Sequence, residues 1–97
     1  MASPGAVLAI DHGTRRTGFA VADALRITSE PLTTFHGAGD GDDLLDFIAD
    51  LMADRQVNVF VVGQPLNMDG TAGPRAKDVG EFCARLSARF PGPELAL

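Results

Sequence analysis

Two short and continuous apolar runs stand out in the pattern of hydrophobic and polar positions. Ala6–Ile10 ends in the carboxylate Asp11, and Val57–Val62 is the most β-branched segment of the chain. Apolar runs of this length without alternation are typical of strands that are buried on both faces of a sheet, and such strands usually run parallel. We therefore expect two parallel strands in the interior of a sheet, each covered on both faces.

Between these runs the pattern predicts a hairpin and an outer strand. About five residues separate Asp11 from the second apolar segment, Thr17–Asp23, and so short a connection favours an antiparallel pair. A third strand is expected from Ile27–Ser29 together with Leu32–Phe35. Pro31 interrupts it and cannot donate a ladder hydrogen bond, which predicts an edge strand or a bulge.

Two later segments have helical spacing. The first spans roughly 42–55 and carries one apolar stripe, formed by Leu44, Leu45, Ile48, Leu51 and Met52. The second begins at Pro74, a favoured first residue of a helix. Its apolar stripe consists of Ala76, Val79, Cys83, Leu86 and Phe90. The final residues, Glu94–Leu97, predict the start of a further strand, so the expected order is three strands, helix, strand, helix, strand.

Length and composition narrow the class of protein. The chain has 97 residues, which fit one domain spanning 1–97, and 45% of them are hydrophobic, enough for a packed core. A net charge of −5 excludes binding of nucleic acid by bulk positive charge but leaves room for a local basic patch. The lone cysteine, Cys83, excludes an internal disulfide framework and is expected to be a core thiol.

No targeting or membrane segment is visible in the sequence. The longest apolar runs fall far short of the ~20 residues that a membrane-spanning helix needs. The opening residues, Met1–Pro4, lack the charged start of a signal peptide. We therefore expect a cytoplasmic protein that does not bind membranes.

Asp11 is the strongest candidate for chemistry. It ends a buried strand, where a carboxylate is costly unless a partner compensates it. It either holds a Mg²⁺ or Mn²⁺ ion, which prefers carboxylate and water oxygens, or accepts backbone N–H bonds in the turn at Gly13 and Thr14. Because sites form at the carboxyl ends of parallel strands, Gly63 should lie beside Asp11.

Other polar residues surround this position in the sequence. Arg15 and Arg16 follow Asp11 in a turn, where they either bind phosphate groups of a polyanion or serve as solubilising residues. Asp69 leaves the same edge of the sheet, although an Asp-Gly turn explains it more simply. His12 is expected to be a turn residue and not a ligand.

Two separate motifs resemble a known family. Ala9–Asp23, AIDHGTRRTGFAVAD, is similar to the opening of the YqgF/RuvX family of pre-16S rRNA nucleases, which are also described as Holliday junction resolvases. Val61–Thr71, VVGQPLNMDGT, resembles the loop after that family's central strand. The resemblance implies an α/β fold of the RNase H-like class: a mixed sheet with three antiparallel strands first, followed by helix, strand and helix.

The resemblance also implies a function and a set of site residues. It suggests a Mg²⁺- or Mn²⁺-dependent nuclease that hydrolyses phosphodiester bonds, either in 5′-end processing of pre-16S rRNA or in branched DNA. Asp11 matches the family's first catalytic aspartate and is the expected metal ligand, since carboxylate-held ions activate water and steady the leaving oxygen. Thr14, Arg15, Arg16 and Asn67 are the expected nucleic-acid-binding residues.

The chain departs from the family pattern at three points. His12 and Gln64 stand where the family more often has apolar residues. The family also continues with a strand that ends in Asp-Glu-Arg and with a C-terminal helix that carries another aspartate. This chain ends as that strand begins, so we expect a domain without these parts and little or no cleavage by it alone.

Two other functions fit part of the pattern. A non-catalytic remnant of the same fold would bind nucleic acid or form a homodimer through the open edge at Leu95–Leu97, because unpaired strand edges recruit partners. Alternatively, Asp11–Thr14 resembles the phosphate loop of the sugar-kinase and actin superfamily. Those proteins need two domains and several hundred residues, so the length of this chain argues against that alternative.

Overall fold

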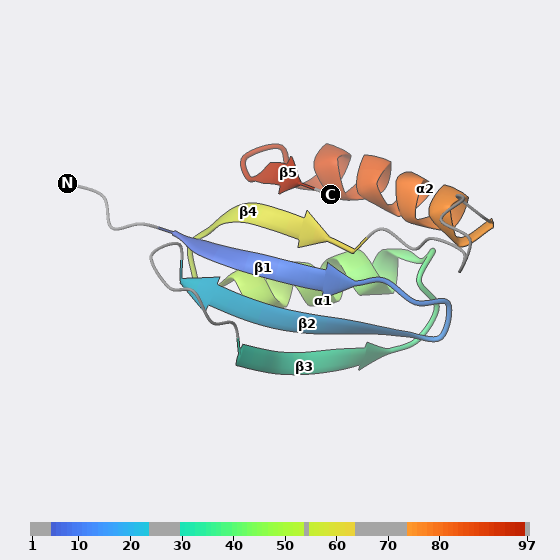
Figure 1. Ribbon diagram of the computed structural model, residues 1–97, viewed down its shortest axis with the longest axis horizontal. Coiled ribbons are helices and arrows are strands. Elements are labelled where there is room, and N and C mark those ends of the chain that lie inside the picture. Colours follow the sequence, from blue (N-terminus) through green and yellow to red (C-terminus); the bar gives the residue numbers. More distant parts are fainter. Residues whose placement is uncertain (1–4, 24–29, 54, 64–73, 97) are drawn as a thin grey trace, which may run out of the picture.

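One five-stranded mixed sheet organises the chain (Figure 1). The computed structural model describes residues 5–23, 30–53, 55–63 and 74–96. Their elements are β1 (Ala6–Asp11), β2 (Arg16–Asp23), β3 (Glu30–His36), α1 (Asp42–Ala53), β4 (Val57–Val62), α2 (Pro74–Arg89) and β5 (Glu94–Ala96). The strand order is β3-β2-β1-β4-β5, and the predicted order of elements is confirmed.

The pairing of β1 fixes the centre of the sheet. It runs antiparallel to β2, with Asp11 opposite Gly18, and parallel to β4, with Ile10 beside Val62. The backbone N–H of Gly63 donates to the Ile10 carbonyl at 3.0 Å. Both the expected hairpin and the expected parallel pair are confirmed, and Gly63 lies beside the end of β1 as predicted.

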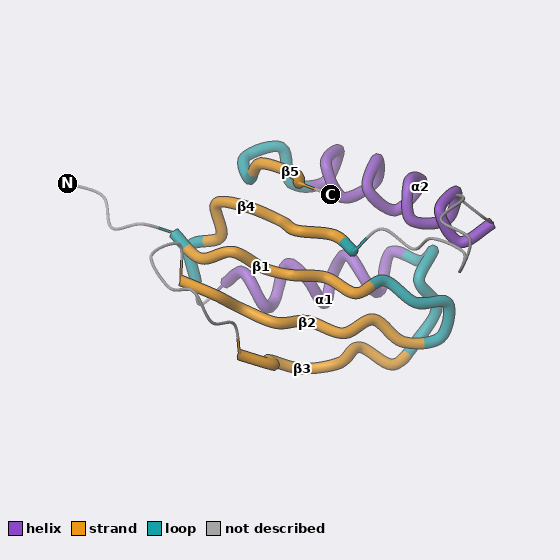
Figure 2. Tube along the Cα trace, viewed as in Figure 1, coloured by secondary structure: helices purple, strands orange, loops and turns teal. Residues whose placement is uncertain are grey.

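The outer strand β3 has both features that Pro31 predicted. It pairs only with β2, so it forms one edge of the sheet, as Figure 2 shows. The register shifts between Phe19, which faces Thr33, and Ala20, which faces Pro31. The expected contribution of residues 27–29 to this strand lies outside the described residues.

Both helices pack on the same face of the sheet. Leu8, Ile10 and Phe60 of the strands share one buried cluster with apolar residues of α1 and α2. Figure 1 shows α1 behind the strands and no described helix in front of them. The expectation that β1 and β4 are covered on both faces is therefore wrong: Val61, on the other face of β4, is 37% exposed. Successive side chains of a strand point to opposite faces, and the helices of the described residues cover only one of them.

The helical stripes are largely as predicted. In α1 the buried residues are Leu44, Leu45 and Ile48, and in α2 they are Val79, Phe82, Cys83 and Leu86. Phe82 was not part of the predicted stripe. Burial removes water from the Cys83 thiol and raises its pKa, which agrees with the expected core thiol. No helix of the described ranges is long and apolar enough to cross a membrane.

Replacement of Gly80 should stabilise the fold. Gly80 is exposed within α2, and a Cβ added there would meet no described atom within 4 Å. Alanine restricts the unfolded chain more than glycine and favours a helix, so Gly80→Ala should raise the free energy of unfolding by about 1 kcal/mol. Urea denaturation followed by circular dichroism measures this; an unchanged or lower midpoint would contradict the helix assignment.

Candidate nucleic-acid and metal site

The side chain of Asp11 belongs to the face of the sheet that the helices leave open. Leu8 and Ile10 point into the core and are at most 2% exposed, so the alternation along β1 directs Ala9 and Asp11 the other way. Asp11 is exposed. Across the strands it stands in one row with Gly18 of β2 and Thr34 of β3.

Two hollows meet at this row. A cleft of about 440 Å³ follows the β1–β2 turn, and its lining includes Asp11, Thr14, Arg15 and Arg16. A wider groove of about 720 Å³ extends over the open face along Ala9, Ala20 and Val61. Both hollows share three residues: Asp11, Gly18 and Thr34. The structure thus brings together four of the five residues expected at the site, and the fifth, Asn67, lies outside the described residues.

The turn that carries the two arginines is anchored by its backbone. The N–H of Gly37 donates to the Arg15 carbonyl at 2.9 Å, and the N–H of Gly39 donates to the Thr14 carbonyl at 3.3 Å. A Cβ at Gly13 would collide with the Arg16 carbonyl oxygen, so a side chain there would displace the turn. The loop after β3 therefore holds the exposed arginines next to Asp11.

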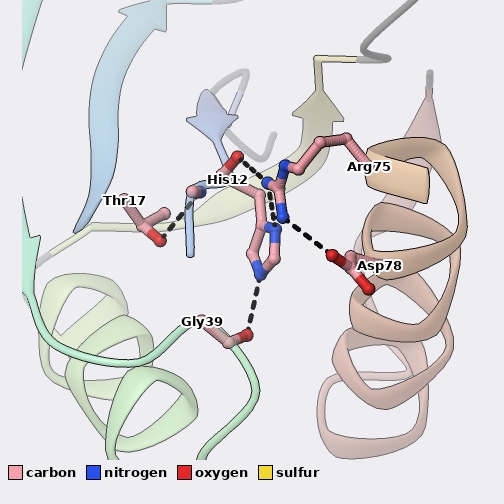
Figure 3. Close-up of polar contacts among 6 residues, drawn as sticks. His12, Thr17, Gly39, Arg75 and Asp78 are labelled. Atoms are coloured by element: carbon pink, nitrogen blue, oxygen red, sulfur yellow. Dashed lines mark hydrogen bonds and ion pairs between the residues drawn. The ribbon is translucent and has the colours of Figure 1, made fainter. Parts of the chain in front are cut away.

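His12 links this turn to α2, as Figure 3 shows. Its Nε2 lies 2.7 Å from the Gly39 carbonyl oxygen. One guanidinium nitrogen of Arg75, Nη2, donates to the His12 carbonyl at 2.7 Å and lies 3.2 Å from Nδ1 of the ring. The other, Nη1, donates to Asp78 at 3.1 Å. The ring also stacks on Phe82, with 4.5 Å between centroids.

These contacts assign the ring a structural role. A carbonyl oxygen only accepts and a guanidinium only donates, so Nε2 carries the hydrogen toward Gly39 while Nδ1 accepts from Arg75. His12 is thus more than the turn residue that was expected. The sequence did contain a signal for this packing. His12 comes two residues after buried Ile10, and the alternation of side chains along a strand places both on the face that the helices cover. The partner Arg75, 63 residues away, could not be read from the sequence.

A third hollow lies on the other side of His12 and is not a good candidate. It measures about 340 Å³, and Asp11 is not among its lining residues. Both of its arginines already bind residues of the hollow: Arg75 contacts Asp78 and His12, and Arg85 donates to the Asp40 carbonyl. No buried side-chain nitrogen or oxygen among the described residues lacks a partner there.

The described residues fit one divalent ion better than two. Asp11 supplies one exposed carboxylate, and a single carboxylate with water and phosphate oxygens is an ordinary environment for Mg²⁺. No group of three or more His, Cys, Asp or Glu side chains with metal-binding geometry occurs among the described residues. A site for two ions needs more acidic groups than these ranges provide.

The strand order and the aspartate at the end of β1 define an RNase H-like domain. Three antiparallel strands come first, and α1, β4, α2 and β5 add parallel strands on the other side of β1. This is the arrangement that the motifs implied.

Comparison with known proteins names the family. A model of the RuvX family, described as "Holliday junction resolvase", matches residues 5–96. Proteins named "Putative pre-16S rRNA nuclease" from Rhodobacter capsulatus, Anaeromyxobacter dehalogenans and Sodalis glossinidius are 40%, 43% and 39% identical over 92%, 89% and 93% of this chain. The chain spans 55%, 62% and 63% of the length of these relatives. It belongs to the RuvX family.

Loss of the His12 ring should loosen the turn beside Asp11. His12→Ala removes the hydrogen bond to Gly39 and the stacking on Phe82, so we expect a loss of about 1–3 kcal/mol in the free energy of unfolding. His36→Ala is the matched control, because His36 is exposed at the end of β3. Its effect should stay within about 0.5 kcal/mol. Equal urea midpoints for the two variants would show that the His12 contacts contribute nothing.

Proposed function

We propose that this chain is the nucleic-acid-binding and metal-binding part of a metal-dependent nuclease, a hydrolase of phosphodiester bonds. One observation carries the proposal: Asp11, Arg15 and Arg16 line a single open cleft at the carboxyl end of β1. The cleft offers a carboxylate for a cation and two guanidinium groups for phosphate. Membership of the RuvX family supports the same assignment.

Each side of the cleft has a distinct task in this proposal. Arg15 and Arg16 bind phosphate oxygens, which a guanidinium group recognises through paired N–H donors, and Thr14 adds a hydroxyl on the same side. Asp11 holds Mg²⁺ or Mn²⁺ together with water. The bound ion would supply charge neutralisation at the phosphate and a more acidic water. The anchored turn keeps the backbone that carries the arginines next to Asp11 before the nucleic acid arrives.

The substrate and the location are finer parts of the proposal. The names of the relatives support pre-16S rRNA as the substrate, and we propose that the cleavage belongs to its 5′-end processing. The family description, Holliday junction resolvase, supports branched DNA as the other substrate. A cytoplasmic location would suit an enzyme that processes ribosomal RNA. Asn67 is retained as a further proposed contact to nucleic acid.

We also propose that residues 1–97 form one RNase H-like domain that cleaves poorly or not at all by itself. Asp11 is the single acidic residue that lines the two hollows at the site, as far as the described ranges show. One carboxylate binds an ion more weakly than the several that a two-ion site uses. Binding of Mn²⁺ and of nucleic acid therefore tests the proposed site of this chain better than its rate of cleavage does.

Replacement of Asp11 tests the proposed site. Mn²⁺ binding, measured by electron paramagnetic resonance of the free ion, should weaken at least about tenfold in Asp11→Asn, because an amide carries no charge for the cation. Asp43→Asn is the control, since Asp43 is an exposed carboxylate of the first turn of α1. Binding of labelled single-stranded RNA in the presence of Mn²⁺ should fall in parallel.

Two results would contradict parts of this proposal. Equal Mn²⁺ affinity in Asp11→Asn and the wild-type chain would rule out Asp11 as the ligand. Rapid Mn²⁺-dependent cleavage of RNA or of a branched DNA, abolished by Asp11→Asn, would show instead that the 97 residues are active without further acids.

A non-catalytic, dimerising role is the second candidate. β5 forms the edge of the sheet opposite β3, contributes three residues and pairs only with β4. Such an edge offers unpaired backbone groups to another strand. We propose a homodimer through this edge, and sedimentation equilibrium should then give twice the mass of the chain, with reversal to a monomer in Leu95→Pro. A monomer at all accessible concentrations would exclude it.

A further inference from the structure

Gly18 lies next to the proposed site, and because it has no side chain it leaves space there. It lies in the interior of β2, opposite Asp11 on one side and Thr34 on the other. Glycine in a strand interior lowers stability because it gives up packing and conformational restriction. A glycine at such a position therefore costs stability unless the space that it leaves is used.

The backbone of this chain does not use that space. A Cβ built on Gly18 would meet only the Cβ of Asp11, at an ordinary contact distance of 4.0 Å, among the described atoms. Gly13 and Gly39 differ, because a Cβ at either would collide with backbone carbonyl oxygens of the turn. The fold thus tolerates a side chain at Gly18, and the space that the glycine leaves is open to a ligand that approaches the open face.

The absent side chain leaves a gap between Asp11 and Thr34. Adjacent strands lie about 4.8 Å apart, so these two residues, two strands apart, are separated by roughly 10 Å. A Mg²⁺ ion with its oxygen shell is about 7 Å across, from metal–oxygen distances of ~2.1 Å and a water radius of ~1.4 Å. These separations are between atom centres. A side chain at Gly18 would stand about 5 Å from both neighbours, so once the radii of the atoms are counted almost no space would be left between Asp11 and Thr34 for a directly bound ion or a phosphate oxygen.

We propose that Asp11, Gly18 and Thr34 form a notch that seats one phosphate of the nucleic acid together with the divalent ion. Gly18 is the floor, Asp11 holds the ion, and the hydroxyl of Thr34 donates a hydrogen bond to a phosphate oxygen. Thr34 is exposed and lines both hollows that meet at Asp11, so its hydroxyl is accessible from either. This inference rests on the proposed function and adds two residues to its site.

The notch orders the nucleic-acid chain on the protein. Arg15 and Arg16 line the cleft alone, whereas Thr34 lines both hollows and belongs to the edge strand β3, across Gly18 from Asp11. A phosphate in the notch would then leave a neighbouring phosphate for Arg15 and Arg16. Thr34 would consequently position the nucleic-acid strand on the protein and would take no part in the chemistry at the phosphate.

Four variants of the 97-residue chain test the notch. Gly18→Val fills it, Gly18→Ala fills it partly, and Thr34→Val removes only the hydroxyl. Thr33→Val is the matched control, because Thr33 is exposed in the same strand but stands opposite Phe19 in the register, and it lines only the wider groove, not the cleft that holds the arginines. Each variant is measured for urea unfolding, for Mn²⁺ binding by electron paramagnetic resonance, and for binding of a labelled single-stranded RNA in Mn²⁺ by fluorescence anisotropy.

The notch predicts different losses for the variants. Gly18→Val should unfold at the same or a higher urea concentration, because valine favours a strand, while its affinities for Mn²⁺ and RNA fall about tenfold or more. Gly18→Ala should give a smaller loss. Thr34→Val should weaken RNA binding about two- to tenfold, as expected for one hydrogen bond, with Mn²⁺ affinity unchanged. Thr33→Val should change neither affinity.

The outcomes separate this inference from the proposed function. Unchanged affinities in folded Gly18→Val, with a loss in Asp11→Asn, would overturn the notch and leave the metal site standing. Wild-type Mn²⁺ affinity in Asp11→Asn would overturn both. Marked destabilisation in Gly18→Val and Gly18→Ala alike would show that packing requires the glycine. Equal RNA binding in Thr34→Val and Thr33→Val would remove Thr34 from the site.

Discussion

The burial of Leu8 and Ile10 determines where the carboxylate of Asp11 points, and the candidate site follows from that constraint. Strand side chains alternate, so two core residues at alternate positions send Ala9 and Asp11 to the opposite face. A slip by one residue would reverse every side chain of β1, but pairing with β2 on one side and β4 on the other holds the register. The packing of the core therefore fixes the direction of the Asp11 carboxylate, while the carboxylate itself stays exposed to solvent.

The same alternation turns the next residue, His12, toward the helices. Asp11 faces the open side, whereas His12 turns back toward α2 and joins Gly39, Arg75 and Phe82. The turn after β1 is thus held by a half-buried ring and by backbone hydrogen bonds. Its backbone has little conformational freedom left to lose on binding, so only the side chains of Arg15 and Arg16 have to be ordered by the phosphates.

The sequence was informative where the physical signal is local. Apolar runs, helical spacing and a short connection predicted every element and the hairpin, and Thr14, Arg15 and Arg16 had to be near Asp11 because they follow it directly. Which face of the sheet the helices cover was not predictable, since an apolar run such as Val57–Val62, interrupted only by Asn58, does not alternate and so carries no information about sides. The His12–Arg75 contact depends on how α2 docks, and no spacing rule reaches across 63 residues. Asn67 remains a prediction.

An acidic chain can hold a polyanion here because its charges are separated in space. The exposed acids of α1, such as Asp46 and Asp50, lie on the outer side of a helix layer packed behind the sheet, about 10 Å or more from the open face. Physiological salt screens exposed charges over about 8 Å, so Asp11, Arg15 and Arg16, the charged residues that line the cleft itself, act on a ligand there more strongly than the acids of α1 do. The remaining repulsion between Asp11 and a phosphate is what a divalent ion in the notch would remove, which makes ion binding and nucleic-acid binding mutually dependent.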